Sequence, residues 1–204
     1  YFTDRYKTPW GQAINFDGPD AAGVREYFIQ NVRYWVSEFH IDGLGLDAVH
    51  PIHDSSSHHI LSEIAAAVHE FANQNERIVT VIAESDLNEA RVVHSGDLGG
   101  FGLDAQWSDD FHHAVHALLT GETAGYYEDF GRVEDVAKAL SSGFVYSGQY
   151  SKYRGHRHGT DVAGLPGRAF VVCVQNHDQI GNRMLGERLS HLVSFDDLKL
   201  AAGL

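Results

Sequence analysis

Residues 78–84 read Ile-Val-Thr-Val-Ile-Ala-Glu, a β-branched, apolar run that ends in a carboxylate. A strand buried on both faces has this pattern, because neither face needs polar side chains. Such strands are typical of parallel sheets covered by helices on both sides. We therefore predict an α/β protein in which residues 78–83 form an interior strand and Glu84 lies at its carboxyl end.

The flanking sequence alternates between helical and strand patterns. Apolar residues spaced three and four apart indicate amphipathic helices, and short apolar runs indicate further strands. The helices are expected at residues 24–39, 60–71, 111–119 and 133–142, and the other strands at 44–47, 103–107 and 170–174. Residues 1–19, rich in Thr, Pro, Gly, Asn and Asp, are expected to form an ordered loop. The alternation predicts a parallel sheet with right-handed crossovers.

Acidic residues follow three of these strands: Asp47, Glu84 and Asp178. The carboxyl ends of parallel strands are where α/β folds place their chemistry. Converging carboxylates repel one another, so at least one pKa rises. Glycoside hydrolysis needs an ionised carboxylate beside a protonated one. His50 and His177 could donate hydrogen bonds to sugar hydroxyls, and Trp107 could supply an apolar platform.

Composition narrows the class of protein. The 204 residues carry 15 basic and 28 acidic side chains, a net charge of −13, and 43% are hydrophobic. Such a chain is too apolar for disorder, lacks a membrane-spanning run and is too acidic for a nucleic-acid partner. The single cysteine, Cys173, excludes an internal disulfide framework. Without a recognisable targeting segment, we expect a cytoplasmic protein.

Two other classes of site have weaker signals. His112 and His116 are four residues apart on an expected helix, but the zinc-protease pattern requires Glu directly after the first His. With 14 histidines in the chain, such spacings arise by chance, so neither a metal nor a cofactor is expected. The glycine-rich residues 96–102 match neither a dinucleotide fingerprint nor a Walker A loop.

Three short motifs resemble consecutive motifs of the α-amylase superfamily, glycoside hydrolase family 13. They are Asp-Gly-Leu-Gly-Leu-Asp-Ala-Val-His at 42–50, Ile-Ala-Glu-Ser at 82–85 and Gln-Asn-His-Asp-Gln at 175–179. Longer strings at 1–11 and 104–113 are similar to trehalose-releasing members of that superfamily. The resemblance implies a retaining α-glycosidase that cuts the α-1,4 bond next to the trehalose end of maltooligosyl trehalose.

The resemblance also implies residue roles and an incomplete barrel. Asp47 matches the nucleophile, Glu84 the general acid/base and Asp178 the transition-state stabiliser, with the first two carboxyls expected roughly 5–5.5 Å apart. The substrate-binding residues are expected to be His50, Trp107, Asp109, Asp110, His112, His113, His177 and Gln179. Residues 1–204 would supply about strands 4 to 7 of a (β/α)8 barrel, a fold that takes about 250 residues. We expect the flanking parts to lie outside this chain, and the isolated segment to aggregate.

One position departs from the superfamily pattern. The pattern has Arg two residues before the nucleophile, where this chain has Gly45. An Arg there would lower the nucleophile's pKa by about 1–3 units and orient it. We therefore expect impaired activity. Another superfamily activity, such as glycogen branching, and a non-catalytic carbohydrate-binding protein on the same fold remain the alternatives.

Overall fold

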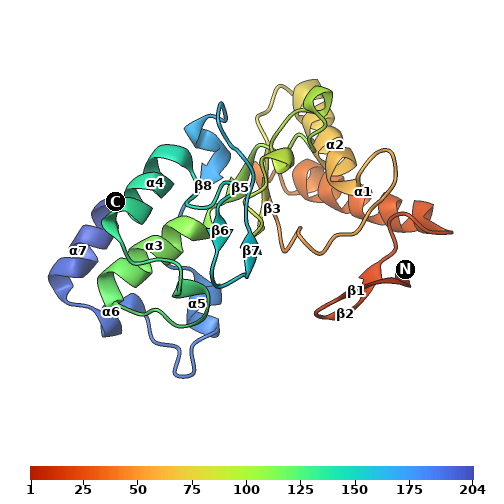
Figure 1. Cartoon of the computed structure of the whole chain (residues 1–204). Coiled ribbons are helices and arrows are strands. Elements are labelled where there is room, and N and C mark those ends of the chain that lie inside the picture. The colour runs from red at the N-terminus through yellow and green to blue at the C-terminus, as the bar shows by residue number, and fades with distance from the viewer. The chain divides into compact units, whose positions relative to one another are not determined.

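The computed structural model describes residues 1–204 and divides them into two units (Figure 1). Unit 1 comprises Tyr1–Ser85 and Ala90–Gln106, and unit 2 comprises Asp86–Glu89 and Trp107–Leu204. Each unit has its own hydrophobic core. None of the helices in either unit is both long enough and apolar enough to cross a membrane.

Unit 1 is built on parallel strands, as the sequence predicts. β3 (Gly43–Leu46) pairs in parallel with β4 (Thr80–Ala83), and β4 pairs in parallel with the start of β5 (Ala105–Trp107). Leu46 lies opposite Ala83, so β3 and β4 end at the same level. This register places the residues that follow the two strands side by side.

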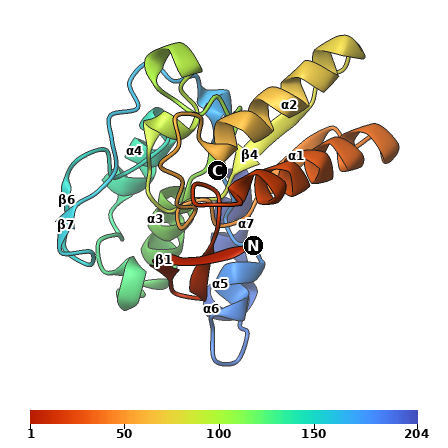
Figure 2. The same ribbon diagram turned by 90° about the vertical axis from the view of Figure 1, so that its right-hand side faces the viewer.

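Two long helices cover one face of these strands. α1 (Ala21–Glu38) and α2 (Ile60–Gln74) lie side by side (Figure 2). Their fully buried Val36 and Val68 belong to the same core cluster as Val81 of β4. The other face of β4 is only half-buried, at Thr80 and Ile82. The predicted burial on both faces is therefore incomplete within unit 1, because α1 and α2 pack on one side.

The N-terminal residues form a hairpin where the sequence predicts a loop. β1 (Phe2–Thr8) and β2 (Gly11–Ile14) pair antiparallel, with a shift of register between Thr3 and Lys7. Of the Pro and Gly residues that contributed to the loop prediction, Pro9 lies in the turn between the two strands and Gly11 begins β2. Gly11 has a φ of 118°, which favours glycine at that position.

Unit 2 is mainly helical. α3 (Asp109–Thr120) and α4 (Val133–Ser142) lie side by side (Figure 1) and share a core that includes Phe111 and Val136. The remaining elements are short: β6 (Tyr150–Ser151), β7 (His156–Arg157), β8 (Phe170–Val171), α5 (His177–Gly181), α6 (Leu189–Leu192) and α7 (Phe195–Gly203). Single 3₁₀ turns span Gly125–Tyr127 and Gly167–Ala169 in unit 2, and Ala90–Val92 and Gly96–Leu98 in unit 1.

The last predicted strand is shorter than expected. Only Phe170 and Val171 of residues 170–174 have strand geometry. The backbone N–H of Ser108 donates to the carbonyl of Val171 at 2.8 Å, whereas the carbonyl of Val174 accepts a hydrogen bond from the side chain of His112. A side-chain donor thus replaces the backbone ladder at the end of this segment.

A buried arginine organises the loop between β3 and α2. Arg25 of α1 donates to Asp54 Oδ2 at 2.7 Å and to the carbonyl of His58 at 2.6 Å, and it pairs with Glu63 at 2.9 Å. The Asp54 side chain is fully buried, and its Oδ2 also accepts the Ile60 N–H at 2.7 Å. One guanidinium therefore ties α1 to the loop and to the start of α2.

Removing this arginine should destabilise the protein strongly. Arg25→Met leaves the buried Asp54 carboxylate without its partner, a kind of change that typically costs about 3–5 kcal/mol. Arg33→Met is the matched control, because the Arg33–Glu70 pair is exposed and its 3.4 Å contact is worth about 0–1 kcal/mol. Urea denaturation of the two variants measures the difference, and equal losses would contradict this account of Arg25.

Candidate active site

Asp47 and Glu84 directly follow the neighbouring strands β3 and β4 of unit 1. The Glu84 N–H donates to the carbonyl of Leu46 at 2.9 Å, and the Val49 N–H donates to the carbonyl of Glu84 at 2.9 Å. The parallel pairing thus continues past both strand ends. It places the two predicted catalytic residues next to each other at one edge of the sheet.

A backbone group next to Asp47 holds the Glu84 side chain. The Ala48 N–H donates to Glu84 Oε2 at 2.9 Å. Ala48 has a φ of 44°, a left-handed conformation that is uncommon for a non-glycine residue and is often found at functional sites. The sequence did not predict this contact, because the donor is a backbone N–H, which nearly every residue type has.

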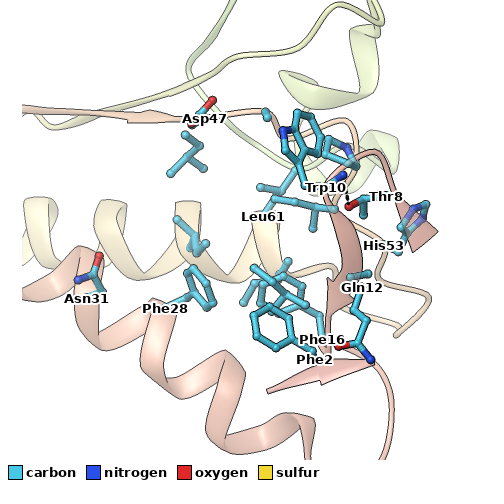
Figure 3. Close-up of a pocket in the computed structure, with 18 of the residues that line it drawn as sticks. Phe2, Thr8, Trp10, Gln12, Phe16, Phe28, Asn31, Asp47, His53 and Leu61 are labelled. Atoms are coloured by element: carbon cyan, nitrogen blue, oxygen red, sulfur yellow. Dashed lines mark hydrogen bonds between the residues drawn. The ribbon is translucent and has the colours of Figure 1, made fainter. Parts of the chain in front are cut away.

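A cavity of about 530 Å³ lies beside Asp47 (Figure 3). Its lining includes Gly45 and Asp47 from the β3 segment, and Trp10 from the tip of the hairpin. A Cβ atom added at Gly45 would meet no heavy atom within 4 Å. Gly45 is the position that departs from the superfamily pattern, and the space around it, next to the predicted nucleophile, is therefore open.

The loop after β3 forms one wall of this cavity. His50 is exposed on this loop, and His53 lines the cavity (Figure 3). The His53 ring stacks on Tyr6 of β1, with centroids 4.7 Å apart and an angle of 18° between the planes. The hairpin thus supports the loop that carries the predicted residue His50.

Asp178 of unit 2 lies in the first turn of α5. Its N–H donates to Oδ1 of Asn176 at 2.8 Å, and the Asn176 N–H donates to Oε1 of Gln179 at 2.8 Å. This reciprocal cap engages the Gln179 side chain, which is buried, whereas the predicted sugar contact His177 is 91% exposed. The Asp178 side chain is 46% exposed, so its carboxylate is accessible.

The two aspartates that begin α3 have different surroundings. Oδ2 of Asp110 is buried and accepts three hydrogen bonds at 2.8 Å, from Asn88 Nδ2 and from the N–H groups of Val145 and Tyr146. These three hydrogen bonds are internal, and they join three segments of unit 2. Trp107, which ends β5 just before α3, is half-buried.

Asp109 belongs to a group of acidic residues. Burial, together with repulsion from Asp86, Asp110 and Asp178, raises its pKa to about 6, while Arg154 opposes the rise. Unit 2 therefore contains an aspartate near the predicted stabiliser Asp178 whose protonation changes close to neutral pH. The sequence predicts a raised pKa among Asp47, Glu84 and Asp178, whereas this raised pKa belongs to Asp109, which the family resemblance implies only as a substrate-binding residue.

The α3 histidines are buried. His112 Nε2 lies 2.9 Å from the Tyr127 hydroxyl, and His116 Nε2 lies 2.7 Å from Glu122 Oε2. Burial lowers the pKa of His112 to about 4 and holds that of His113 well below its usual value. No group of three or more His, Cys, Asp or Glu side chains is arranged to hold a metal ion. Substrate contacts by Asp110, His112 and His113 stay predictions.

Comparison with known proteins relates the chain to enzymes that act on α-glucans. It is 52% identical over its full length to malto-oligosyltrehalose trehalohydrolase of Saccharolobus solfataricus, of which it covers 35%. It is 47% identical over 95% of its length to the protein of that name from Rhizobium sp., of which it covers 33%. A 1,4-alpha-glucan branching enzyme of Mycobacterium bovis is 30% identical over 51% of the chain. No family model matches.

The fold comparison agrees. The crystal structure of a candidate alpha amylase from Salmonella typhimurium matches 98% of this chain with a TM-score of 0.85 and 38% identity, and the match covers 34% of that protein. The predicted fold class, a central part of a (β/α)8 barrel, is confirmed. The chain spans about a third of the length of the curated relatives that it matches.

Replacing Asp109 should stabilise the protein in a pH-dependent way. Its pKa rises from 3.8 to about 6 in the folded state, so the folded protein binds this proton more tightly than the unfolded chain. Stability must then fall as pH rises from about 4 to 6. Asp109→Asn removes the penalty, with a gain of up to about 3 kcal/mol at pH 7 that vanishes below about pH 4.

Urea denaturation at pH 4 and pH 7 measures this gain. Asp97→Asn, at an exposed position in unit 1, is the control and should change stability little at either pH. An equal gain in the free energy of unfolding for Asp109→Asn at pH 4 and at pH 7 would contradict the raised pKa of Asp109.

Proposed function

The chain belongs to the malto-oligosyltrehalose trehalohydrolase family of the α-amylase superfamily, and from that premise we propose that it carries the catalytic centre of a retaining glycoside hydrolase that releases trehalose. The proposed substrate is maltooligosyl trehalose or a related α-1,4-glucan. The bond cut is the α-1,4 bond next to the trehalose end. The observation that carries the proposal is the pairing of Asp47 and Glu84 at the ends of two parallel strands.

In this proposal the two carboxyl groups share the chemistry of a double displacement. Asp47 attacks the anomeric carbon while Glu84 protonates the oxygen of the departing trehalose. The resulting glycosyl–enzyme ester is hydrolysed by water, which Glu84 deprotonates. The Ala48 N–H on Glu84 Oε2 supports this assignment, because it holds the acid/base in a defined orientation next to the nucleophile.

The residues of unit 2 are proposed to bind the substrate. Asp178 would hold sugar hydroxyls as positive charge develops on the ring, and its exposed carboxylate and the neighbouring exposed His177 suit that role. The chain is too acidic for a nucleic-acid partner. We also propose a cytoplasmic location and a part in trehalose synthesis, on the basis of the single cysteine and of the relatives' names.

Gly45 is proposed to reduce activity. A guanidinium two residues before Asp47 would lie on the same face of β3 and keep the nucleophile ionised. The cavity beside Asp47 contains no such cation from β3, since Gly45 has no side chain.

Restoring the arginine should therefore increase trehalose release. Gly45→Arg has room for its side chain. In an otherwise complete enzyme we expect trehalose release from maltotriosyl trehalose to rise at least about tenfold, because the guanidinium would hold the nucleophile in one orientation. Gly23→Arg in α1 is the matched control, because its Cβ also meets nothing within 4 Å but it does not line the cavity. Equal activity of Gly45→Arg and the parent chain would defeat this account.

Removing the acid/base should abolish most of the activity. In the Gly45→Arg background, Glu84→Gln should lower trehalose release by about 10²–10⁴-fold, because the leaving oxygen loses its proton donor. Glu134→Gln, at an exposed position in α4, is the control.

Proton NMR of the first products tests the stereochemistry. A retaining enzyme releases the shortened maltooligosaccharide initially as its α-anomer. Initial release of the β-anomer would overturn the nucleophilic role of Asp47. New α-1,6 branches among the products would favour the branching alternative, and saccharide binding without turnover in the Gly45→Arg protein would favour the non-catalytic one.

A further inference from the structure

A chain of contacts in unit 2 leads from α3 to both ends of the segment that carries Asp178. It involves four side chains, called the α3 brace here: His112, His116, Glu122 and Tyr127. At the start of the segment, His112 Nδ1 lies 2.5 Å from the carbonyl of Val174. At its end, Arg183 donates from Nη1 and Nη2 to the two oxygens of Glu122, at 2.8 and 2.9 Å. The segment 174–183 is therefore held at both ends.

The geometry decides where the proton on His112 lies. The Val174 carbonyl can only accept, so His112 Nδ1 must be the N–H donor. The neutral ring then leaves Nε2 as an acceptor, and the Tyr127 hydroxyl donates to it at 2.9 Å. Burial lowers the pKa of His112 to about 4, which agrees with a neutral ring. The tautomer is thus set by two partners at once.

His116 connects Tyr127 with Glu122. Its ring stacks on Tyr127 with centroids 4.3 Å apart and an angle of 14° between the planes, and Nε2 lies 2.7 Å from Glu122 Oε2. Nδ1 of His116 is buried and has no hydrogen-bond partner. The ring position is therefore set by Tyr127 and Glu122, because no contact at Nδ1 contributes to it.

Glu122 is the point where the brace meets a positive charge. The hydrogen bonds from Arg183 are the main reason that the pKa of Glu122 falls to about 2, and His116 lowers it as well. Paired charged hydrogen bonds of this geometry resist rotation more than single neutral ones. The pair therefore fixes the position of Arg183, two residues beyond the end of α5.

We propose that the α3 brace positions the Asp178 carboxylate by clamping both ends of its segment. Between the clamped ends the side chains of His177 and Asp178 stay exposed, so the segment offers accessible groups on a restrained backbone. In this proposal the brace residues act through the segment that they hold, and they are positioning residues. The consequence for catalysis depends on the proposed function, whereas the restraint on the backbone does not.

Hydrogen exchange of the protein tests the restraint directly. Glu122→Gln weakens the Arg183 contact, and we expect amides within residues 174–183, including that of Asp178, to exchange about tenfold faster or more. Glu187→Gln is the matched control: Glu187 also contacts Arg183, at 3.4 Å from Nε, but it makes no contact with the brace residues. Unchanged exchange in Glu122→Gln, or equal acceleration in Glu187→Gln, would overturn the brace.

A second variant tests the contacts of His112, at the Val174 end of the segment. Tyr127→Phe removes the hydroxyl that donates to His112 Nε2, while it keeps the ring that stacks on His116. In ¹⁵N spectra the parent protein should show a single His112 tautomer, protonated at Nδ1, and the variant a mixture of the two. A single unchanged tautomer in Tyr127→Phe, or a parent protonated at Nε2, would overturn the proposed contacts.

Kinetics in the Gly45→Arg background separate positioning from general stability. Glu122→Gln should lower kcat for trehalose release about tenfold with KM changed less than twofold, and Arg183→Lys, which keeps the charge, should lose less than Arg183→Met. A loss confined to KM, or equal losses for the Lys and Met variants, would overturn the positioning role. If the Gly45→Arg protein releases no trehalose, the proposed function fails, while exchange and tautomer measurements still decide the brace.

Discussion

The candidate site depends on the parallel register of β3 and β4. Leu46 lies opposite Ala83, so β3 and β4 end at the same edge of the sheet. The residue that follows each strand, Asp47 or Glu84, is acidic. A slip by one residue would turn the side chains of one strand to the other face and separate the pair. The buried side chain of Val81, packed with those of α1 and α2, prevents such a slip, because it would move an apolar residue out of the core.

In the same region, hydrogen bonds hold Glu84 and the loop after β3, whereas the space beside Asp47 at Gly45 is open. Glu84 is oriented by the Ala48 N–H, and Arg25 and Asp54 hold the following loop. Gly45, on the same strand, contributes no side chain beside the nucleophile. The acid/base is therefore held in place, whereas the nucleophile lacks support from position 45. We expect this combination if the scaffold was shaped for catalysis and the glycine lowers only the reaction rate.

Unit 2 uses its polar residues in a different way. α3 begins with two aspartates and carries three histidines, and the family resemblance assigns both aspartates, His112 and His113 to the substrate. In the structure Asp110 joins internal segments, and the brace histidines hold the segment of Asp178. Buried polar groups must find partners, so a polar helix face packed inside a protein becomes a network. The pKa of Asp109 is raised to about 6 by burial first and then by the neighbouring carboxylates, and burial raises the pKa of Asp110 as well.

The sequence by itself determined the α/β class, most helix positions and the acids after the strands, because periodicity and strand-end chemistry are local signals. It missed the hairpin at Phe2–Ile14, since turn residues such as Pro9 look alike in a loop and at a hairpin tip. Only the tertiary structure decided that Ala48 donates to Glu84 and that His112 holds Val174. These contacts join residues far apart in the chain, and packing alone brings them together. The residue types identified the candidate carboxylates, whereas only the structure showed how buried each one is and which groups donate hydrogen bonds to it.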